Sequence, residues 1–438
     1  MSGVSTELPE CRTHVRVGIL GFGVVGSGVY RMLGENAEAI HERIGSTIDV
    51  VSVGVRDATK PRGVPARLVT TDLRAIVDDP RIDVILELIG GTEPAGELVE
   101  RALRNGKSVV TANKELIAKH GARLVELAKK KGLDLHFEAA VGGGIPLVQP
   151  LKHQLAGNDV LKLMGILNGT TNYILTRMSL EGGDFETVLA DAQELGYAEA
   201  DPTNDVDGYD SAYKLAILGS IAFGRHVPIE GVYREGIRGI QARDLEFAEV
   251  LGYRIKLVGI VEPIGKDAVL ARIHPALIPK SHPLASVEGV YNAVWIHGDF
   301  VGDVMFSGRG AGSDPTASAV VGDLIDVGRN LNAQGRGSAI PIGKPIRTVP
   351  IQDLETEFYV RVIVKDQPKV LGHIALAMGD HDVSLAAMEM RVLDNEGLRG
   401  EIVFLTHTSR ESQFRAVLDQ IVKEELVESI EAWFRVEG

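Results

Sequence analysis

Short apolar runs alternate with amphipathic stretches over residues 15–138, and this pattern predicts the architecture of the first third of the chain. Buried strands are expected at 15–20, 48–55, 83–88, 108–111 and 133–137. Helices are expected after Gly21, after Thr92 as an N-cap, and at 114–131, where Gly132 follows a basic last turn. Strands that alternate with helices are typical of a parallel sheet covered on both faces, so we expect a nucleotide-binding type of α/β domain at 15–137.

The pattern loses its strict alternation after residue 138. A run of three glycines at 142–144 is followed by apolar segments, a strand expected at 160–167, and helices around 173–180 and 207–223. We expect a separate α+β domain at 138–310 and a helix at 311–331 that packs back on the first domain. Residues 332–343 are rich in glycine, alanine and serine, which is typical of a flexible stretch, and we place a linker at 332–356.

The C-terminal segment, 357–438, shows a third pattern. Strands are expected at 358–364, 383–390, 402–406 and 427–433, and helices at 370–378 and 411–424. The resulting β-α-β-β-α-β order predicts a ferredoxin-like domain. Three domains of this kind fit a length of 438 residues.

The composition of the chain mainly excludes certain kinds of protein and site. Apolar residues at 45% and charged residues at 24% are ordinary for a globular protein, and a net charge of −14 counts against a nucleic-acid partner. No apolar run is long enough to span a membrane, and residues 1–14 carry no signal-like core, so we expect a disordered tail and a cytoplasmic protein. The single cysteine, Cys11, excludes an intrachain disulfide and a cysteine-rich zinc site.

The strongest chemical signal is a glycine motif between the first strand and the first helix. The run Gly21-Phe22-Gly23-Val24-Val25-Gly26 follows the G-x-G-x-x-G pattern. Its glycines allow a tight turn, a close approach of the backbone to a pyrophosphate, and close packing of the helix on the strand. Glycine turns also serve purely structural roles, but between a strand and a helix whose amino end can bind phosphate the motif indicates dinucleotide binding.

The end of the second strand discriminates between coenzymes. An acidic side chain there binds the ribose 2′-hydroxyl of NAD(H), whereas this chain has Arg56 followed by Asp57. Because a guanidinium favours a 2′-phosphate, we predict a preference for NADP(H). Asp57 keeps NAD(H) open as an alternative, and a simple surface pair of Arg56 with Asp57 is the structural alternative.

Three further positions each allow two interpretations, a chemical role and an ordinary structural role. Lys114 follows the strand at 108–111, at the edge where such sheets bind ligands, although a solvated lysine in a first helical turn is the commoner situation. Glu138 precedes the three glycines, whose carbonyls could coordinate a cation or simply form a turn. The run Asn168-Gly169-Thr170-Thr171-Asn172 begins a helix, and it could bind a substrate carboxylate or act as an ordinary N-cap.

Carboxylates are concentrated at 197–214, ahead of a lysine. They are Glu199, Asp201, Asp205, Asp207 and Asp210. Asp210 lies four residues before Lys214, so the two side chains share one face of a helix. From spacing alone, the favoured interpretation is an exposed ion pair worth about 0.3–0.5 kcal/mol.

Together the motifs resemble homoserine dehydrogenase, and the resemblance covers nearly the whole chain. The matching blocks, in the family's order, are GFGVVG, TANKELIA, EAAVGGGIP, NGTTNYIL, AEADPTNDVDGYDSAYK and SGRGAGSDPTASAV. The resemblance implies an α/β chain with a Rossmann-type nucleotide-binding domain, an α+β catalytic and dimerisation domain, and a C-terminal ferredoxin-like ACT domain. It also implies a homodimer or homotetramer that acts in threonine, methionine and isoleucine biosynthesis.

The resemblance also assigns roles to the ambiguous residues. It implies that Lys214 is the acid–base lysine and that Lys114 is a second positive charge at the reacting oxygen. The implied substrate-binding residues are Glu199, Asp210, Thr170 and Tyr197. The implied coenzyme-binding residues are Gly21, Phe22, Gly23, Val24, Val25, Gly26, Arg56, Thr92, Lys114 and Gly310, the last in a loop where Arg309 replaces the family's usual proline. A monovalent cation, expected to be sodium, would be bound at Glu138, Val141, Gly143 and Ile145, largely by backbone carbonyls.

The implied reaction is the reversible NAD(P)H-dependent reduction of L-aspartate 4-semialdehyde to L-homoserine. The nicotinamide would deliver hydride to the aldehyde carbon while a lysine ammonium protonates the oxygen, and a neighbouring lysine should depress its pKa towards neutrality. One rival is another amino-acid-linked Rossmann dehydrogenase. Aspartate-semialdehyde dehydrogenase is disfavoured because Cys11 lies outside any plausible site. The other rival is a non-catalytic amino-acid sensor, and the presence of both Lys114 and Lys214 counts against it.

The turn before the first helix of the C-terminal segment departs from the usual ACT signature. ACT domains commonly have Asp-x-Pro-Gly there, whereas this chain has Asp366-Gln367-Pro368-Lys369. Lysine lacks the easy access to positive φ that glycine has. We expect the ACT fold despite this substitution, and we predict L-threonine as its feedback effector.

Overall fold

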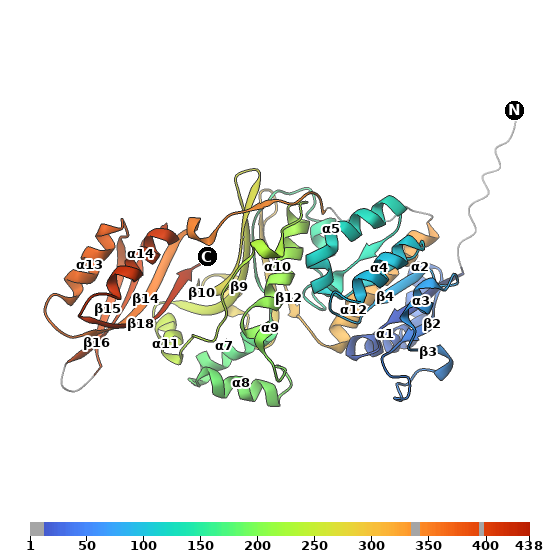
Figure 1. Ribbon diagram of the computed structural model, residues 1–438, viewed down its shortest axis with the longest axis horizontal. Coiled ribbons are helices and arrows are strands. Elements are labelled where there is room, and N and C mark those ends of the chain that lie inside the picture. The colour runs from blue at the N-terminus through green and yellow to red at the C-terminus, as the bar shows by residue number, and fades with distance from the viewer. Residues whose placement is uncertain (1–12, 334–341, 394–397) are drawn as a thin grey trace. The chain divides into compact units, whose positions relative to one another are not determined.

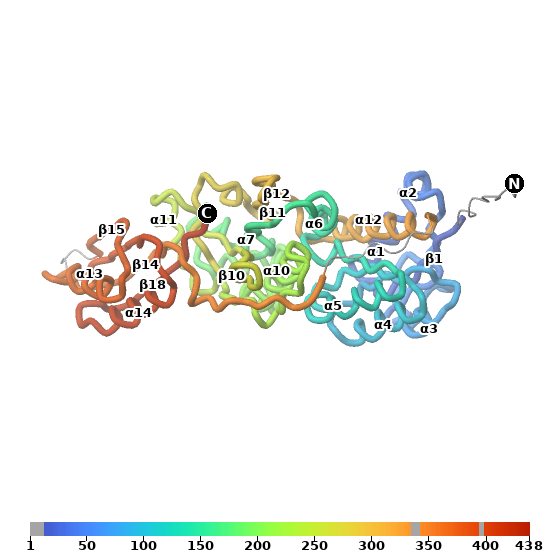
Figure 2. Tube along the Cα trace, turned by 90° about the horizontal axis from the view of Figure 1, so that it is seen from above, coloured from blue at the N-terminus to red at the C-terminus, as the bar shows by residue number. Residues whose placement is uncertain are grey.

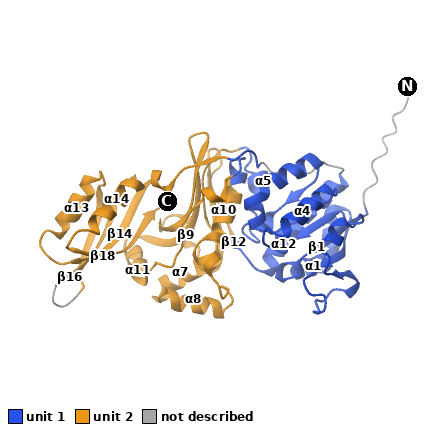
Figure 3. Ribbon diagram, viewed as in Figure 1, with its two compact units in different colours: residues 1–157, 220–226, 308–345 blue, residues 158–219, 227–307, 346–438 orange. Residues whose placement is uncertain are grey.

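The structure is a computed structural model that describes residues 13–333, 342–393 and 398–438 (Figure 1). The chain groups into two compact units (Figure 3): unit 1 comprises 1–157, 220–226 and 308–345, and unit 2 comprises 158–219, 227–307 and 346–438. The predicted tail at 1–14 and the predicted flexible stretch at 332–343 lie largely outside the described residues. In the part of the chain that the structure describes, no helix is long and apolar enough to cross a membrane.

Unit 1 is built on a six-stranded parallel sheet in the order β3-β2-β1-β4-β5-β6. Its strands are β1 (His14–Leu20), β2 (Thr47–Gly54), β3 (Val69–Thr70), β4 (Val84–Glu87), β5 (Ser108–Thr111) and β6 (Leu135–His136). Every residue of β4 and β5 is buried, as expected where helices cover both faces of a parallel sheet. This is the doubly wound order of dinucleotide-binding folds, so the predicted Rossmann-type domain is confirmed.

The helices of unit 1 are α1 (Val24–Glu35), α2 (Ala37–Ile44), α3 (Leu73–Asp78), α4 (Ala95–Arg104), α5 (Lys114–Lys131), α6 (Val148–Lys152) and α12 (Ser313–Asn332), with 3₁₀ turns η1 (Ala66–Leu68) and η2 (Glu138–Ala140). Two of them, α3 and α5, begin at residues whose side chains cap them, Asp72 and Asn113. The expected N-cap at Thr92 is wrong, because α4 begins only after Pro94. Proline fixes φ near its helical value and carries no N–H, which suits it to a helix start.

Helix α12 lies far from the rest of unit 1 in sequence, but it contributes to the same core. It packs along α1, as Figure 2 shows. Val320 and Leu324 share a hydrophobic cluster with Val29 of α1. The Ser313 hydroxyl donates to the Val24 carbonyl at 2.9 Å, so α12 begins directly beside the glycine motif.

Unit 2 is built on one large sheet with the strand order β12-β11-β7-β9-β10-β18-β14-β16-β15. Its strands are β7 (Val160–Ile166), β8 (Tyr233–Arg234), β9 (Tyr253–Ile264), β10 (Ala268–Pro279), β11 (Tyr291–Gly298), β12 (Gly302–Arg309), β13 (Arg347–Thr348), β14 (Glu355–Lys365), β15 (Leu385–Val392), β16 (Arg399–Thr406), β17 (Ser409–Arg410) and β18 (Val427–Val436). Its helices are α7 (Gly169–Glu181), α8 (Phe185–Glu194), α9 (Thr203–Val206), α10 (Tyr209–Ala222), α11 (Ala242–Val250), α13 (Val370–Asp380) and α14 (Glu411–Ile421), with 3₁₀ turns η3 (Ile229–Gly231), η4 (Pro283–Ser286) and η5 (Ile351–Asp353). The last residues of α10 and β12 group with unit 1.

The C-terminal part of unit 2 has the predicted ferredoxin-like order. Strands β14, β15, β16 and β18 alternate with α13 and α14 as β-α-β-β-α-β, and the strands form an antiparallel sheet. Phe358 and Phe414 stack at 4.0 Å between ring centres in its core. At its end, β18 pairs with β14 on one edge and, through Arg435 and Val436, with Ala276 and Leu277 of β10 on the other. The ACT-type domain and the rest of unit 2 therefore share one continuous sheet.

Buried ion pairs hold the last strand in place. The Arg435 guanidinium contacts Glu411 at 2.7 Å and Glu235 at 2.8 Å, and Arg272 contacts Glu437 at 2.7 Å. Both arginine side chains are almost fully buried. Because a buried charge is costly unless it is paired, these contacts tie the end of β18 to β10 and to the residue that follows β8.

Candidate active site

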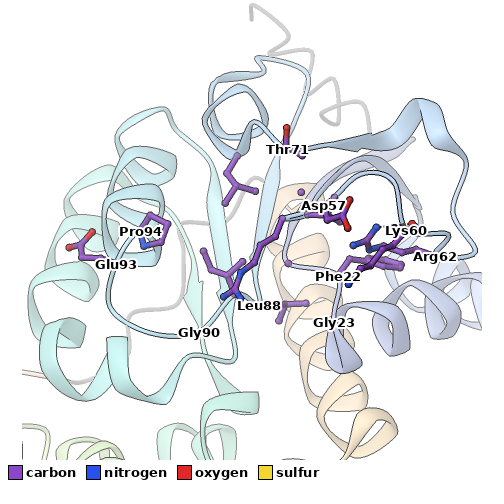
Figure 4. A pocket seen from close by; sticks show the side chains of 16 residues that line it. Phe22, Gly23, Asp57, Lys60, Arg62, Thr71, Leu88, Gly90, Glu93 and Pro94 are labelled. Carbon is purple, nitrogen blue, oxygen red and sulfur yellow. Dashed lines mark hydrogen bonds between the residues drawn. The ribbon is translucent and has the colours of Figure 1, made fainter.

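A cavity of about 560 Å³ opens in unit 1 where β1, β2 and β4 end (Figure 4). The residues that line it are Gly21, Phe22, Gly23, Gly54, Val55, Arg56, Asp57, Lys60, Arg62, Thr71, Leu73, Leu88, Ile89, Gly90, Glu93 and Pro94. Strands β1 and β4 are neighbours although they are not consecutive, so the cavity lies at the switch point of the sheet. In doubly wound sheets, dinucleotides bind at this point.

The glycine motif has the close backbone approaches that its pattern predicts. Gly21 has φ 98°, and a side chain there would come within 2.6 Å of the Leu88 carbonyl oxygen. A Cβ at Gly26 would come within 2.3 Å of the Gly21 carbonyl oxygen. No side chain caps the amino end of α1, which begins after Gly23. The first turn of α1 therefore presents backbone N–H groups to this cavity.

Cationic side chains gather at one side of the cavity. Lys60 and Arg62 lie on the same side as Phe22 and Asp57 (Figure 4), and Arg56 is exposed on the same lining. Asp57 accepts hydrogen bonds from the Thr59 hydroxyl at 2.6 Å and the Thr59 amide at 2.9 Å, and these bonds lower the pKa of its carboxyl. Among the described ion pairs none joins Arg56 to Asp57. Lys60 and Arg62 were not predicted as coenzyme-binding residues. Their position in the loop that follows Arg56 could have indicated that they line the cavity.

The other predicted coenzyme-binding residues belong to unit 1 but are not among the residues that line the cavity. Lys114 is half-buried at the first position of α5, directly after the end of β5. Thr92 is next to Glu93 and Pro94, which line the cavity. Gly310 is buried against the glycine run, since a Cβ on Gly143 would come within 2.6 Å of the Gly310 carbonyl.

The predicted cation residues form one tight turn. The buried Glu138 carboxylate accepts from the amides of Leu147 at 2.5 Å and of Val148 and Gln149 at 2.8 Å each. Burial raises the pKa of this carboxyl, while the amide bonds lower it. The carboxylate therefore acts as the cap of α6. Nowhere among the described residues do three or more acidic, histidine or cysteine side chains lie together in a group that could bind a metal ion.

Three backbone carbonyl oxygens in the same turn could coordinate a cation. The residues Val141, Gly143 and Ile145 are buried, and within the described segments their carbonyl oxygens accept no hydrogen bond. Gly143 has φ 55°, which turns the chain so that a site made mainly of carbonyls is feasible. The donor set is hard oxygen, the type preferred by alkali and alkaline-earth ions.

Beneath this turn lies a buried ionic cluster. Asp323 accepts from the Glu138 amide at 2.8 Å, and its other oxygen lies 3.4 Å from His136. Asp134 lies 3.4 Å from the second nitrogen of the same ring. Burial alone would lower the pKa of His136, but the two carboxylates outweigh it and raise the pKa to about 9. The cluster fixes the chain just before the turn.

In unit 2, the Asp210–Lys214 pair is buried, so its interpretation as an exposed surface pair is wrong. The two side chains are 5% and 8% exposed, and their charged atoms are 2.7 Å apart. The Lys214 ammonium also donates to the Leu167 carbonyl at 2.7 Å, at the end of β7. Asn168, whose amide group donates to Asp210 at 3.0 Å, caps α7 and joins the cluster. The ammonium is therefore desolvated and held in one orientation.

The remaining substrate-binding candidates are Thr170, in the first turn of α7, and Tyr197 and Glu199, on the segment that follows α8. The Thr170 hydroxyl donates to the Tyr197 carbonyl at 2.6 Å, and the rings of Tyr197 and Tyr173 are 4.9 Å apart. Glu199 is exposed two residues further on. Because Asn168 and Thr170 belong to one helix start, the structure brings Asp210, Lys214, Thr170 and Tyr197 into one continuous set of contacts.

Known proteins are similar to this chain over nearly its whole length. Family models match the homoserine dehydrogenase NAD-binding domain at 21–138, homoserine dehydrogenase at 146–325 and the ACT domain at 358–426. A homoserine dehydrogenase of Synechocystis sp. is 46% identical over 436 residues, 96% of this chain and 99% of that protein. The crystal structure of a homoserine dehydrogenase from Thiobacillus denitrificans matches with a TM-score of 0.91 at 42% identity, over 97% of this chain and 98% of the other. A hyperthermophilic archaeal homoserine dehydrogenase in complex with NADPH matches with a TM-score of 0.61 at 29% identity, over 72% of this chain and 97% of the other. The chain therefore belongs to the homoserine dehydrogenase family and is an NAD(P)-dependent oxidoreductase.

Proposed function

We propose that Lys214 is the proton donor in the reversible reduction of L-aspartate 4-semialdehyde to L-homoserine by this enzyme. The observation that carries the proposal is the burial of its ammonium, held at 2.7 Å by both Asp210 and the Leu167 carbonyl. When bound, the coenzyme supplies a hydride to the aldehyde carbon. Lys214 would give one N–H proton to the carbonyl oxygen in the same step, so that no free alkoxide forms.

The neighbouring groups have complementary tasks in this proposal. Asp210 holds the Lys214 ammonium in its orientation, and Asn168 fixes the Asp210 carboxylate by donating to it at 3.0 Å. The exposed Glu199 carboxylate, and the segment that Thr170 holds through the Tyr197 carbonyl, would bind the substrate's ammonium group. Recognition of that charge would favour an amino acid over a simple aldehyde.

The activity is tested by the loss of NADPH absorbance when L-aspartate 4-semialdehyde is added. The reverse assay uses L-homoserine with NADP⁺, because the reaction is reversible. A control with an aldehyde of similar length that lacks the amino group should be turned over far more slowly. Equal rates with both aldehydes would contradict the proposed role of the carboxylates.

We also propose that NADP(H) is preferred over NAD(H). The support is the group of three cations at the cavity, together with the engagement of Asp57 by Thr59, which leaves that carboxylate poorly placed for a ribose hydroxyl. The archaeal relative in complex with NADPH is consistent with this preference. Arg56→Gln should raise the KM for NADPH about ten- to a hundredfold, the equivalent of roughly 1.5–3 kcal/mol for one charged hydrogen bond, and should leave the KM for NADH nearly unchanged. Arg81→Gln, outside the cavity lining, is the matched control, and equal losses with both coenzymes would contradict the assignment.

We infer a monovalent cation site at Val141, Gly143 and Ile145, next to Glu138. The support is the set of three buried carbonyl oxygens without hydrogen-bond donors. Sodium would supply the missing electrostatic partner of these dipoles and stiffen the turn that packs on Gly310. Activity and melting temperature should both rise in sodium chloride relative to tetramethylammonium chloride at equal ionic strength. The same values in both salts would contradict the site.

L-Threonine is our proposed effector of the ACT domain, in an even-numbered oligomer. The domain is tied to the rest of unit 2 by β18 and by the Arg435–Glu235 contact, so binding there could be felt at β8. Calorimetry on the intact chain, with D-threonine as the control, tests binding, and sedimentation tests the oligomeric state. The intact chain is needed because removal of residues 357–438 would leave Arg272 buried without Glu437. An absence of heat with L-threonine would contradict the effector proposal.

A further inference from the structure

Glu87 is a fully buried acid at the carboxyl end of β4, and the reaction as described above does not use it. Its carboxylate accepts from the amides of Ile89 at 2.9 Å and Gly90 at 3.3 Å, and from the Thr111 hydroxyl at 2.6 Å. These donors are all neutral. Burial raises the pKa of Glu87, and these hydrogen bonds work against that rise. A buried carboxyl is costly in a strand where an apolar residue would pack well, so its presence calls for a reason.

One side of this carboxylate holds a loop of the coenzyme cavity. Ile89 and Gly90 both line the cavity. Gly90 and Gly91 have φ values of 73° and 71°, a left-handed conformation that glycine adopts without steric cost. The Asn113 side chain donates to the Gly91 carbonyl at 2.6 Å, so the loop is fixed at both of its ends.

The other side of the carboxylate holds the start of α5. Thr111 lies directly opposite Glu87 in the parallel ladder of β4 and β5. Its hydroxyl donates to Glu87 and accepts from the Asn113 amide at 3.0 Å. Asn113 in turn caps α5 by accepting from the Leu116 amide at 3.0 Å. Lys114 is the first residue of the helix placed in this way.

We propose that Glu87 is a positioning residue that locks the coenzyme-contacting loop 88–91 and the Lys114 helix start into one rigid edge. A carboxylate suits this task because it accepts from several donors at once, on both of its oxygens. An apolar residue at this position would leave two loop amides and a hydroxyl unsatisfied beside the coenzyme. The proposal rests on the coenzyme site described above, and it concerns binding as well as turnover.

The main test compares Glu87→Gln with the parent in coenzyme Kd, kcat and melting temperature. Glutamine keeps the size of the side chain and can still accept from the loop amides, but its NH₂ group cannot accept from Thr111. We expect the NADPH Kd to rise and kcat to fall by about tenfold or more each, as expected for a lost hydrogen bond to a charged group. The matched control is Lys107→Met. Lys107 is equally buried, bonds the Asp79 and Ile82 carbonyls at 2.6 and 2.8 Å, and lies at the opposite, amino end of β5.

Lys107→Met should lower the melting temperature and leave the NADPH Kd and kcat within about twofold of the parent. A second pair of variants keeps the test valid if Glu87→Gln folds poorly. Thr111→Ser retains the hydroxyl and should behave like the parent, whereas Thr111→Val retains the branched shape and should reproduce the Kd and kcat losses.

Two results would overturn the proposal. One is a Glu87→Gln variant that melts earlier but keeps the parent's Kd and kcat, as the Lys107→Met control does. The other is equal kinetics for Thr111→Ser and Thr111→Val. The NADPH Kd is measured without substrate, so it tests Glu87 even if the parent fails to reduce the semialdehyde and the proposed reaction is abandoned.

Discussion

Replacing Lys369 by glycine should stabilise the C-terminal domain. Lys369 has φ 85° and ψ −13°, and the Gln367 carbonyl accepts from the Val370 amide at 3.3 Å. With Pro368 in the second position, this is a type II turn, whose third position favours glycine. Lys369 therefore adopts the positive φ that the third position of this turn requires, and its Cβ makes that conformation unfavourable.

The size of the gain follows from two opposing terms. A left-handed backbone costs a residue with a Cβ roughly 1–2 kcal/mol. Glycine loses about 0.4–1 kcal/mol more conformational entropy when the chain folds. The difference predicts a gain of about 1 kcal/mol or slightly less for Lys369→Gly. Lys369→Ala keeps the Cβ and removes the charge, so it should change stability by no more than about 0.5 kcal/mol.

Urea unfolding followed by tryptophan fluorescence measures this gain. The chain has two tryptophans, and Trp433 packs on Phe358 and Phe414 in the core of the domain. In a Trp295→Phe background, Trp433 therefore reports on this domain alone. If Lys369→Ala stabilises as much as Lys369→Gly, the effect comes from charge and the reasoning is wrong. It is also wrong if the glycine variant is no more stable than the parent.

Three other outcomes are expected. Since the pKa of His136 is about 9 in the fold and near 6.5 when unfolded, its ionic contacts should contribute roughly 3 kcal/mol below pH 6.5 and fade as the pH rises through 9. The loss of unfolding free energy in His136→Gln, measured in urea, should therefore become smaller as the pH rises. A loss that does not change with pH would contradict this expectation. Arg361→Met leaves Asp244 buried without the guanidinium at 2.7 Å and should cost roughly 3–5 kcal/mol in unfolding free energy. A second change, Asp244→Asn, should restore part of that loss, whereas simple addition of the two losses would refute the coupling. Gly132→Ala and Gly143→Ala both place alanine at positive φ, but only Gly143→Ala meets backbone at 2.6 Å, so its melting temperature should be clearly the lower of the two.

The features that sequence predicted best are those set by neighbours along the chain. The glycine motif depends on a strand, a turn and a helix within a few residues, and Gly21 and Gly26 meet backbone where the pattern requires glycine. The start and end of α5 follow from Asn113 and Gly132, which cap it. The N-cap expected at Thr92 failed because a nearby proline set the helix start instead.

Burial and long-range pairing could not be predicted in the same way. Strands β9 and β10 were not predicted from the sequence. Strand β10 is buried on both faces, so it shows no alternation of period two. The spacing of Asp210 and Lys214 predicted their contact. Their burial depends on Leu167 and Asn168, more than forty residues earlier in the chain. For the same reason, Glu87 gave no signal until Thr111 was seen opposite it.

The role of Lys214 as the proton donor is tested by the kcat of Lys214→Met. Methionine keeps the apolar stem and removes the ammonium, so folding should survive and the NADPH Kd, set in unit 1, should change little. Lys256→Met is the control. Lys256 is buried in unit 2 and bonds the Val287 carbonyl at 2.6 Å, so its loss should reduce stability with little effect on kcat. If Lys214 donates the proton, kcat should fall by roughly 10² to 10⁴ in Lys214→Met. A loss below about fivefold, smaller than proton-transfer catalysis contributes, would contradict the claim and make Lys114 the better candidate for the acid.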